Sequence, residues 1–203
     1  MKQIADCIHN PRVEGFLKKS CHREPGNVEG TMEHTTALLD ELISFIDQLT
    51  EGEKTFGPST ALVRYGREFP VIAPKPGWLR MGEKRNCYNT ATTYAVTRSD
   101  IFYVEGYAFE PELPFPVQHA WLVDANGQVI DPTYEDTTDH VYFGIAFKRD
   151  FVIDMLARNN GQAGLLVNLH LLRRQFRDPM LLEDAIRGSM ALIPRDRSSG
   201  ILT

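Results

Sequence analysis

The sequence predicts an α+β protein with helices at both ends and a meander of antiparallel strands in the middle. A helical pattern precedes residue 50, short β-rich segments follow between residues 101 and 147, and helical patterns return after residue 148. Strands and helices do not alternate along the chain, which disfavours a doubly wound parallel sheet. A chain of 203 residues and 23.0 kDa is expected to form a single domain.

The N-terminal part, residues 1–80, is predicted to be a helical and irregular extension. Apolar residues recur at helical spacing over residues 38–49, and Thr31 or Thr35 can cap the start of this helix. Residues 53–80 contain four prolines and three glycines. We therefore expect an irregular or short-stranded segment there.

The central part, residues 81–147, is predicted to hold one short helix followed by four strands. The helix covers residues 87–96, with Asn86 as its N-cap. Segments rich in β-branched and aromatic residues indicate strands at 101–109, 117–124, 128–131 and 141–147.

Asn126-Gly127 indicates a tight hairpin turn, because both residues tolerate positive φ. A hairpin centred between these two residues places His119 opposite Tyr134 and Asp131 opposite Leu122. The final part, residues 148–203, is predicted to be helical at 148–158, at 169–176 and after Asp178-Pro179, a typical helix start.

Composition excludes several classes of protein. The content of 42% hydrophobic and 24% charged residues is ordinary for a globular domain, and the net charge of −5 disfavours nucleic acid as a partner. No apolar run approaches the roughly 18 residues that span a bilayer, and the N-terminus lacks the pattern of a secretory signal. Three cysteines are too few for a disulfide scaffold. We expect a cytoplasmic protein without membrane contact.

Three residues of the central part have the types that thiol catalysis requires. Cys87 begins a predicted helix, whose N-terminus favours a thiolate. His119 lies on the second predicted strand and can exchange a proton with the thiol, while Asp131 ends the third and can orient the imidazole. In the hairpin register given above, contact between His119 and Asp131 requires a bulge or a wider loop.

Three short motifs carry a family resemblance. Asn86-Cys87-Tyr88-Asn89, then His119-Ala120-Trp121, then Asp131-Pro132-Thr133 resemble the transglutaminase-like branch of the papain-like cysteine superfamily. The resemblance covers residues 80–135, and Asn86 departs from it because a small residue usually precedes the thiol.

The resemblance implies a papain-like catalytic core, in which a nucleophile-bearing helix packs on an antiparallel sheet. It further implies acyl transfer through a thioester, with Cys87 as nucleophile, His119 as general base and acid, and Asp131 as the orienting group. Hydrolysis of an amide or peptide bond is preferred over transglutaminase-type amide exchange, because the short chain shows no module for a second substrate. The expected substrate is a peptide, a protein or a small amide, and the reaction requires no cofactor.

Further residues are candidates for binding the oxyanion or the substrate. The backbone N–H of Cys87 is the natural first oxyanion donor. Side-chain candidates are Asn86 and Gln118 as donors, Trp121 beside the histidine, and Tyr103, Glu105 and Tyr107 as rim residues on one face of a strand.

Two alternatives stay open on the sequence alone. A non-catalytic binding or regulatory protein can use the same fold, with the basic residues Arg173, Arg174 and Arg177 at its contact surface. A zinc-stabilised module would use Cys7, His9, Cys21 and His22, although their spacing fits no common zinc finger. The sequence does not determine the oligomeric state.

Overall fold

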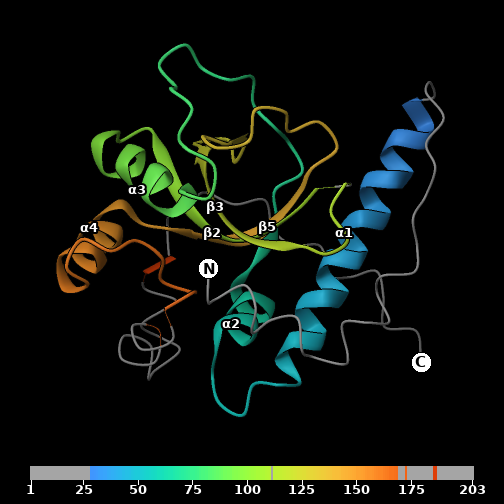
Figure 1. The fold of residues 1–203 in the computed structure, drawn as a ribbon, viewed down its shortest axis with the longest axis horizontal. Coiled ribbons are helices and arrows are strands. Elements are labelled where there is room, and N and C mark those ends of the chain that lie inside the picture. Colours follow the sequence, from blue (N-terminus) through green and yellow to red (C-terminus); the bar gives the residue numbers. More distant parts are fainter. Residues whose placement is uncertain (1–27, 111, 169–171, 173–184, 187–203) are drawn as a thin grey trace.

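The computed structural model describes residues 28–110, 112–168, 172, 185 and 186 (Figure 1). Within these residues the helices are α1 (Val28–Thr50), α2 (Pro58–Tyr65), α3 (Cys87–Thr97) and α4 (Arg149–Arg158). The strands are β1 (Arg67–Glu68), β2 (Ile101–Phe109), β3 (Val117–Asp124), β4 (Val129–Ile130) and β5 (Val141–Phe147). They form one antiparallel sheet in the order β1-β5-β2-β3-β4. The predicted combination of helices and an antiparallel sheet is confirmed, but the sheet is not a simple meander, because β5 pairs with β2 and not with β4.

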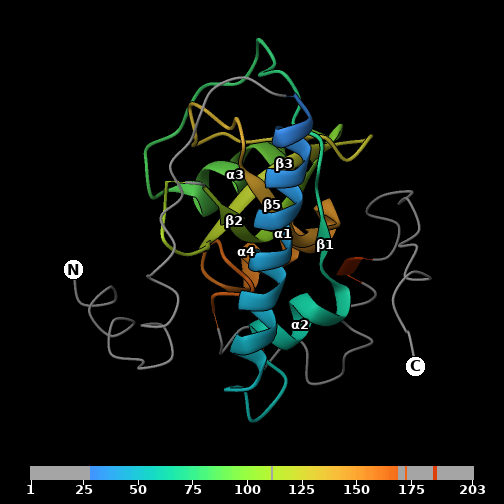
Figure 2. The same ribbon diagram turned by 90° about the vertical axis from the view of Figure 1, so that its right-hand side faces the viewer.

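The described helices all pack on one face of the sheet. Their apolar side chains, among them Leu42 of α1, Leu62 of α2, Ala91 of α3 and Met155 of α4, form one core with the odd-numbered residues of β2 and β5. Figure 2 shows α1 crossing the sheet, where it packs beside α2 and β5. Among the described residues, no helix is both long enough and apolar enough to span a membrane.

Loops cover the opposite face of the sheet. Phe69 and Ile72 pack there against a second apolar cluster that includes Trp121 and Tyr142. The segment that carries them pairs through β1 with β5 at one edge of the sheet, and through Ile72 with Val129 of β4 at the other. The sheet is therefore curled, with both of its faces buried.

Helix α2 was not expected, because residues 53–80 were predicted to be irregular or short-stranded. Pro58 occupies a position in the first turn, where a missing N–H costs nothing. The Glu53 carboxylate accepts hydrogen bonds from the N–H groups of Ser59 and Thr60, both at 2.9 Å. This cap lies six residues before its first partner, outside the local spacing of the usual capping motifs.

The predicted hairpin register was wrong by one residue. Asp124 N–H donates to the Gln128 carbonyl at 3.1 Å, which leaves a three-residue loop with Gly127 at φ 80°. The Asp124 carboxylate stabilises this wider loop by accepting from the N–H groups of Asn126 and Gln128. Leu122 consequently pairs with Ile130. Continuing this register places Asp131 across from Trp121, on the face that also carries His119.

Candidate active site

The structure brings His119 and Asp131 into direct contact. The imidazole Nε2 of His119 lies 2.7 Å from Oδ2 of Asp131, and the two residues are only 4% and 2% exposed. Since the Nε2 atom is hydrogen-bonded to Asp131, the other ring nitrogen, Nδ1, is the one that can hydrogen-bond the Cys87 thiol. The one-residue shift of the hairpin supplies the wider loop that the sequence required for this contact.

Both carboxylate oxygens of Asp131 are held by hydrogen bonds. Oδ1 accepts from the backbone N–H of Thr133 at 2.8 Å, from its hydroxyl at 3.0 Å and from the N–H of Tyr134 at 2.9 Å. Oδ2 accepts from the Tyr142 hydroxyl at 3.0 Å, in addition to His119. Burial raises the pKa of Asp131, but the charge of His119 and these hydrogen bonds outweigh burial and hold the pKa below its usual range.

Aromatic rings surround the His119 imidazole. Its ring centroid lies 4.7 Å from that of Tyr134, and it stacks on Trp121 at 6.1 Å with an interplanar angle of 14°. Burial lowers the pKa of His119, whereas the charge and hydrogen bond of Asp131, together with the Cys87 thiol, raise it to about 9. Asp131 and the thiol therefore favour the protonated form of the imidazole.

Cys87 is the first residue of α3, and its side chain meets His119 at the edge of β3. Burial raises the pKa of the Cys87 thiol, but hydrogen bonding and charge from His119 and the backbone N–H groups of Ala120 and Tyr88 lower it further than burial raises it. The pKa consequently lies below its ordinary value of 9.0. A low thiol pKa beside a high imidazole pKa favours a thiolate–imidazolium pair.

The two halves of this site come from opposite faces of the sheet. Helix α3 packs on the helical face, whereas His119 lies among residues of the loop-covered face, next to Trp121. Along β3, strand β4 pairs with Leu122 and Val123 and extends no further toward His119. Because β4 stops there, the N–H of Ala120 at the edge of β3 can bond the sulfur, and Cys87 can approach His119 around this edge.

The remaining candidates from the sequence lie in three different environments. Asn86 occupies the predicted N-cap position but makes no capping hydrogen bond, and its Oδ1 accepts instead from Asn89 at 2.7 Å. Gln118 is exposed and donates to the Tyr107 hydroxyl at 3.4 Å. Trp121 is fully buried and packs on His119, so it supports the imidazole from inside the protein.

Tyr103 and Glu105 share a strand face with Tyr107, as expected, but they do not form the rim of an open site. Both have no exposed surface, because the helices and residues 164–166 cover this face of β2. The Glu105 carboxylate accepts hydrogen bonds from the Tyr103 hydroxyl and from backbone N–H groups of that segment. Their expected role at the rim is therefore corrected to one in the core.

Some residues that shape the site carry no recognisable signal in the sequence. Tyr142 reaches Asp131 from β5, and the order of strands that brings it there cannot be read from the chain. Tyr134 follows the Asp-Pro-Thr motif directly and could have been suspected from that position. The proposed zinc residues Cys7, His9, Cys21 and His22 and the basic residues Arg173, Arg174 and Arg177 lie outside the described residues.

Comparison of the chain with protein-family models, with curated proteins and with solved structures gives no match in any of the three.

Proposed function

We propose that the chain is a cysteine-dependent acyl-transfer enzyme with a transglutaminase-like, papain-like core, and that it hydrolyses an amide or peptide bond through a thioester. The observation that carries this proposal is the meeting of Cys87, His119 and Asp131 in one buried cluster. The bond of 2.7 Å between His119 and Asp131 supports it, and so does the effect of His119 on Cys87, since its hydrogen bonding and charge lower the pKa of the thiol. A helix-borne cysteine, a histidine on one strand and an acid after the next strand also agree with the resemblance in the sequence.

In the first step the Cys87 thiolate attacks the carbonyl carbon of the substrate and forms a carbon–sulfur bond. The His119 imidazolium then gives its proton to the leaving nitrogen, the carbon–nitrogen bond breaks, and an amine departs. The N–H of Cys87, at the start of α3, is the proposed donor to the oxyanion. Asp131 acts through His119 as a positioning residue, because its carboxylate holds Nε2 and favours the imidazolium.

In the second step the thioester reacts with water. Neutral His119 takes a proton from the water, the oxygen attacks the carbonyl carbon, and the carbon–sulfur bond breaks. The products are a carboxylic acid and the regenerated thiolate–imidazolium pair. An amine in place of water would give amide exchange by the same route.

Selective alkylation tests the activated thiol. An ordinary thiol is only a few per cent ionised at pH 7, so we expect iodoacetamide to label Cys87 faster than Cys7 and Cys21 by on the order of tenfold. Peptide mass mapping during a time course gives the three rates in one sample. Equal rates for the three cysteines near neutral pH would contradict the proposal.

Acyl transfer itself can be tested with p-nitrophenyl acetate. We expect a burst of p-nitrophenol and an acetyl group on Cys87, which then decays in water. Added glycine methyl ester would divert the acetyl group to the amine if exchange competes with hydrolysis. The Cys87→Ala variant is the control, and a burst of unchanged size in that variant would assign the reaction to another residue.

A further inference from the structure

We propose that Glu105 is a positioning residue for the nucleophile, because it holds residues 164–166 against the first turn of α3. This inference rests on the proposed function, since it concerns how Cys87 is kept reactive. The described contacts form a chain from Glu105 through Leu165 and Leu166 to Gly164, and from there through Tyr88 to the Cys87 sulfur.

The first link is the set of hydrogen bonds at Glu105. Its carboxylate has no exposed surface and accepts from the N–H of Leu165 at 2.6 Å, from the N–H of Leu166 at 2.7 Å and from the Tyr103 hydroxyl at 2.8 Å. These bonds join β2 to a segment 60 residues further along the chain. A buried carboxylate is costly unless it is hydrogen-bonded, so its presence here fixes the position of this segment.

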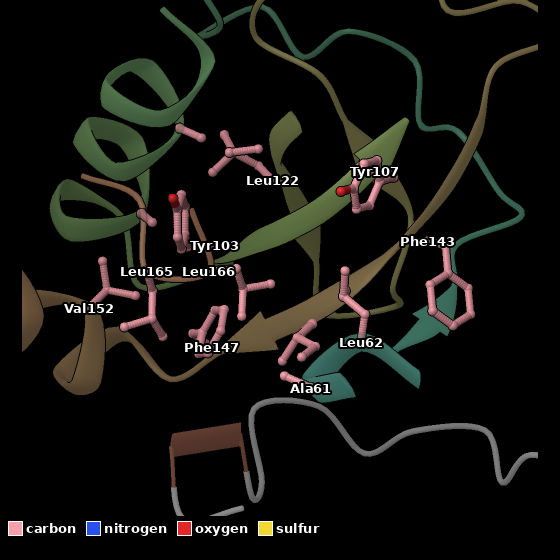
Figure 3. Close-up of a cluster of buried hydrophobic side chains, with 14 of the residues drawn as sticks. Ala61, Leu62, Tyr103, Tyr107, Leu122, Phe143, Phe147, Val152, Leu165 and Leu166 are labelled. Carbon is pink, nitrogen blue, oxygen red and sulfur yellow. The ribbon is translucent and has the colours of Figure 1, made fainter. Parts of the chain in front are cut away.

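The second link is the contact between this segment and α3. Figure 3 shows Leu165 and Leu166 in the core near Tyr103 and Val152. Gly164 is buried at φ +97°, and a Cβ atom added there would lie 3.4 Å from the Tyr88 ring and 2.6 Å from Val167. The segment therefore passes beside the Tyr88 ring, and a side chain at Gly164 would be strained by its positive φ and would clash with Val167.

The third link is the backbone of Tyr88, the residue after the nucleophile. Tyr88 lies next to Cys87 in the first turn of α3, where backbone N–H groups have no partner within the helix, and its N–H helps to lower the pKa of the thiol by hydrogen bonding. A shift of the Tyr88 ring away from its present support would move this N–H and weaken its bond to the thiolate. The proposed function uses neither Glu105 nor Tyr88 as a chemical group, so this is a separate contribution to the site.

The Glu105→Gln variant tests the first link through the pKa of Cys87. A glutamine has one carbonyl oxygen and cannot accept from both backbone N–H groups at their present positions. Positioning predicts a rise of the thiol pKa by about one unit, whereas loss of a nearby negative charge alone would lower it. The pH dependence of iodoacetamide alkylation, checked by thiolate absorbance at 240 nm, gives the pKa.

The Gly164→Ala variant tests the second link without changing any charge. Its methyl group would clash with Val167 and would require a φ of +97° that L residues rarely adopt, so the segment beside Tyr88 must shift. We therefore expect the thiol pKa to rise as in Glu105→Gln. The Ile46→Ala variant in α1 is the control for a general loss of stability, because its buried side chain lies in the same core on a helix that does not carry the site. Its thiol pKa should stay at the wild-type value although its melting temperature falls.

The outcomes separate this inference from the proposed function. A rise of the thiol pKa in Glu105→Gln and in Gly164→Ala, but not in Ile46→Ala, supports the chain of contacts. An unchanged or lower pKa in Glu105→Gln overturns the role of Glu105, and an unchanged pKa in Gly164→Ala overturns the route through Tyr88. If Glu105→Gln does not fold, Glu105→Asp, which is too short to reach both N–H groups, takes its place. An ordinary thiol pKa in the wild type would instead contradict the proposed function.

Discussion

At the scale of single residues, the two carboxylate oxygens of Asp131 bind different partners. Oδ1 binds the turn that follows it through Thr133 and Tyr134, whereas Oδ2 binds His119 and the Tyr142 hydroxyl. The turn thus fixes the carboxylate, and the carboxylate in turn fixes the imidazole. A charged oxygen with several donors and no exposed surface is a strong constraint on orientation.

Asp131→Asn tests whether the charge or only the shape of this side chain matters. Asparagine keeps the size of the group but removes the charge that raises the pKa of His119 to about 9, so burial should bring this pKa to 6.5 or lower. The thiol then loses its imidazolium partner. We expect alkylation of Cys87 at pH 7 to slow by on the order of tenfold to a hundredfold.

An NMR titration of the His119 ring protons checks the cause directly, and the Thr133→Val variant is the matched control. Threonine 133 donates its hydroxyl to Oδ1 at 3.0 Å without touching the imidazole. Its loss should reduce stability by about 1 kcal/mol and leave the pKa of His119 well above 6.5. An unshifted His119 pKa in Asp131→Asn would show that the charge of Asp131 does not hold the imidazolium.

The sequence was sufficient for the types and order of these residues but not for their surroundings. Cys87, His119 and Asp131 stand within recognisable motifs, and the turn residue Gly127 could be expected to adopt positive φ. Tyr142 and the Ala120 N–H act on the site through strand order and through the early end of β4. These are tertiary properties that no local pattern encodes.

At the scale of elements, residues 75–82 connect α3 to the turn that carries the acid. The Tyr94 hydroxyl of α3 bonds both the N–H and the carbonyl of Arg80, each at 2.9 Å. Gly82 N–H donates to the Pro132 carbonyl at 2.7 Å, and Lys75 Nζ donates to the carbonyls of Tyr134 and Glu135. This connecting segment therefore contacts both α3, which begins at Cys87, and the turn that follows Asp131.

Gly82→Ala tests this connection, with Gly77→Ala as its control in the same segment. A Cβ atom at Gly82 would come within 2.5 Å of the Thr90 hydroxyl of α3, whereas one at Gly77 has nothing within 4 Å. We expect Gly82→Ala to lose about 1–3 kcal/mol of stability and to slow alkylation of Cys87, and Gly77→Ala to change neither. Denaturant unfolding and labelling measure both effects. If the two variants have the same stability and the same rate of Cys87 alkylation, the connecting segment does not position the site.

Residues 53–80 show why some elements could not be predicted. Prolines and glycines in residues 53–80 indicated irregular structure, yet α2 forms because the distant Glu53 supplies its cap. By contrast, β2, β3 and β5 follow the predicted ranges, since β-branched and aromatic residues suit strands buried on both faces. Local pattern was a reliable guide where packing agreed with it.

At the scale of the whole molecule, the site exists only when both faces of the sheet are covered. Helices bring Cys87 to one face, and the loops on the other face enclose His119 and Asp131. The protonation of this cluster is consequently linked to the global stability of the fold.

The two ionisable partners act on stability in opposite directions. His119 has a folded pKa of about 9, above its ordinary 6.5, so its contribution is complete below pH 6.5 and is lost as the pH rises to about 9. Cys87 has a folded pKa below its ordinary 9.0, so its contribution is present above pH 9.0 and is lost as the pH falls through the folded value. At a pH above both 6.5 and the folded pKa of Cys87, but below about 9, the native pair holds one proton, on His119. The unfolded chain also holds one proton in this window, on the Cys87 thiol.

The free energy of unfolding should therefore show no net slope from this pair in that window. The wild type and a Cys87→Ser, His119→Gln double variant, which lacks both groups, should give parallel curves of unfolding free energy against pH, because all other titrations are shared. If His119 were protonated beside a neutral thiol, the native state would hold one proton more than the unfolded chain. The wild type would then lose about 1.4 kcal/mol per pH unit relative to the double variant as the pH rises. Urea unfolding at intervals across the window distinguishes the ion pair from an imidazolium beside a neutral thiol.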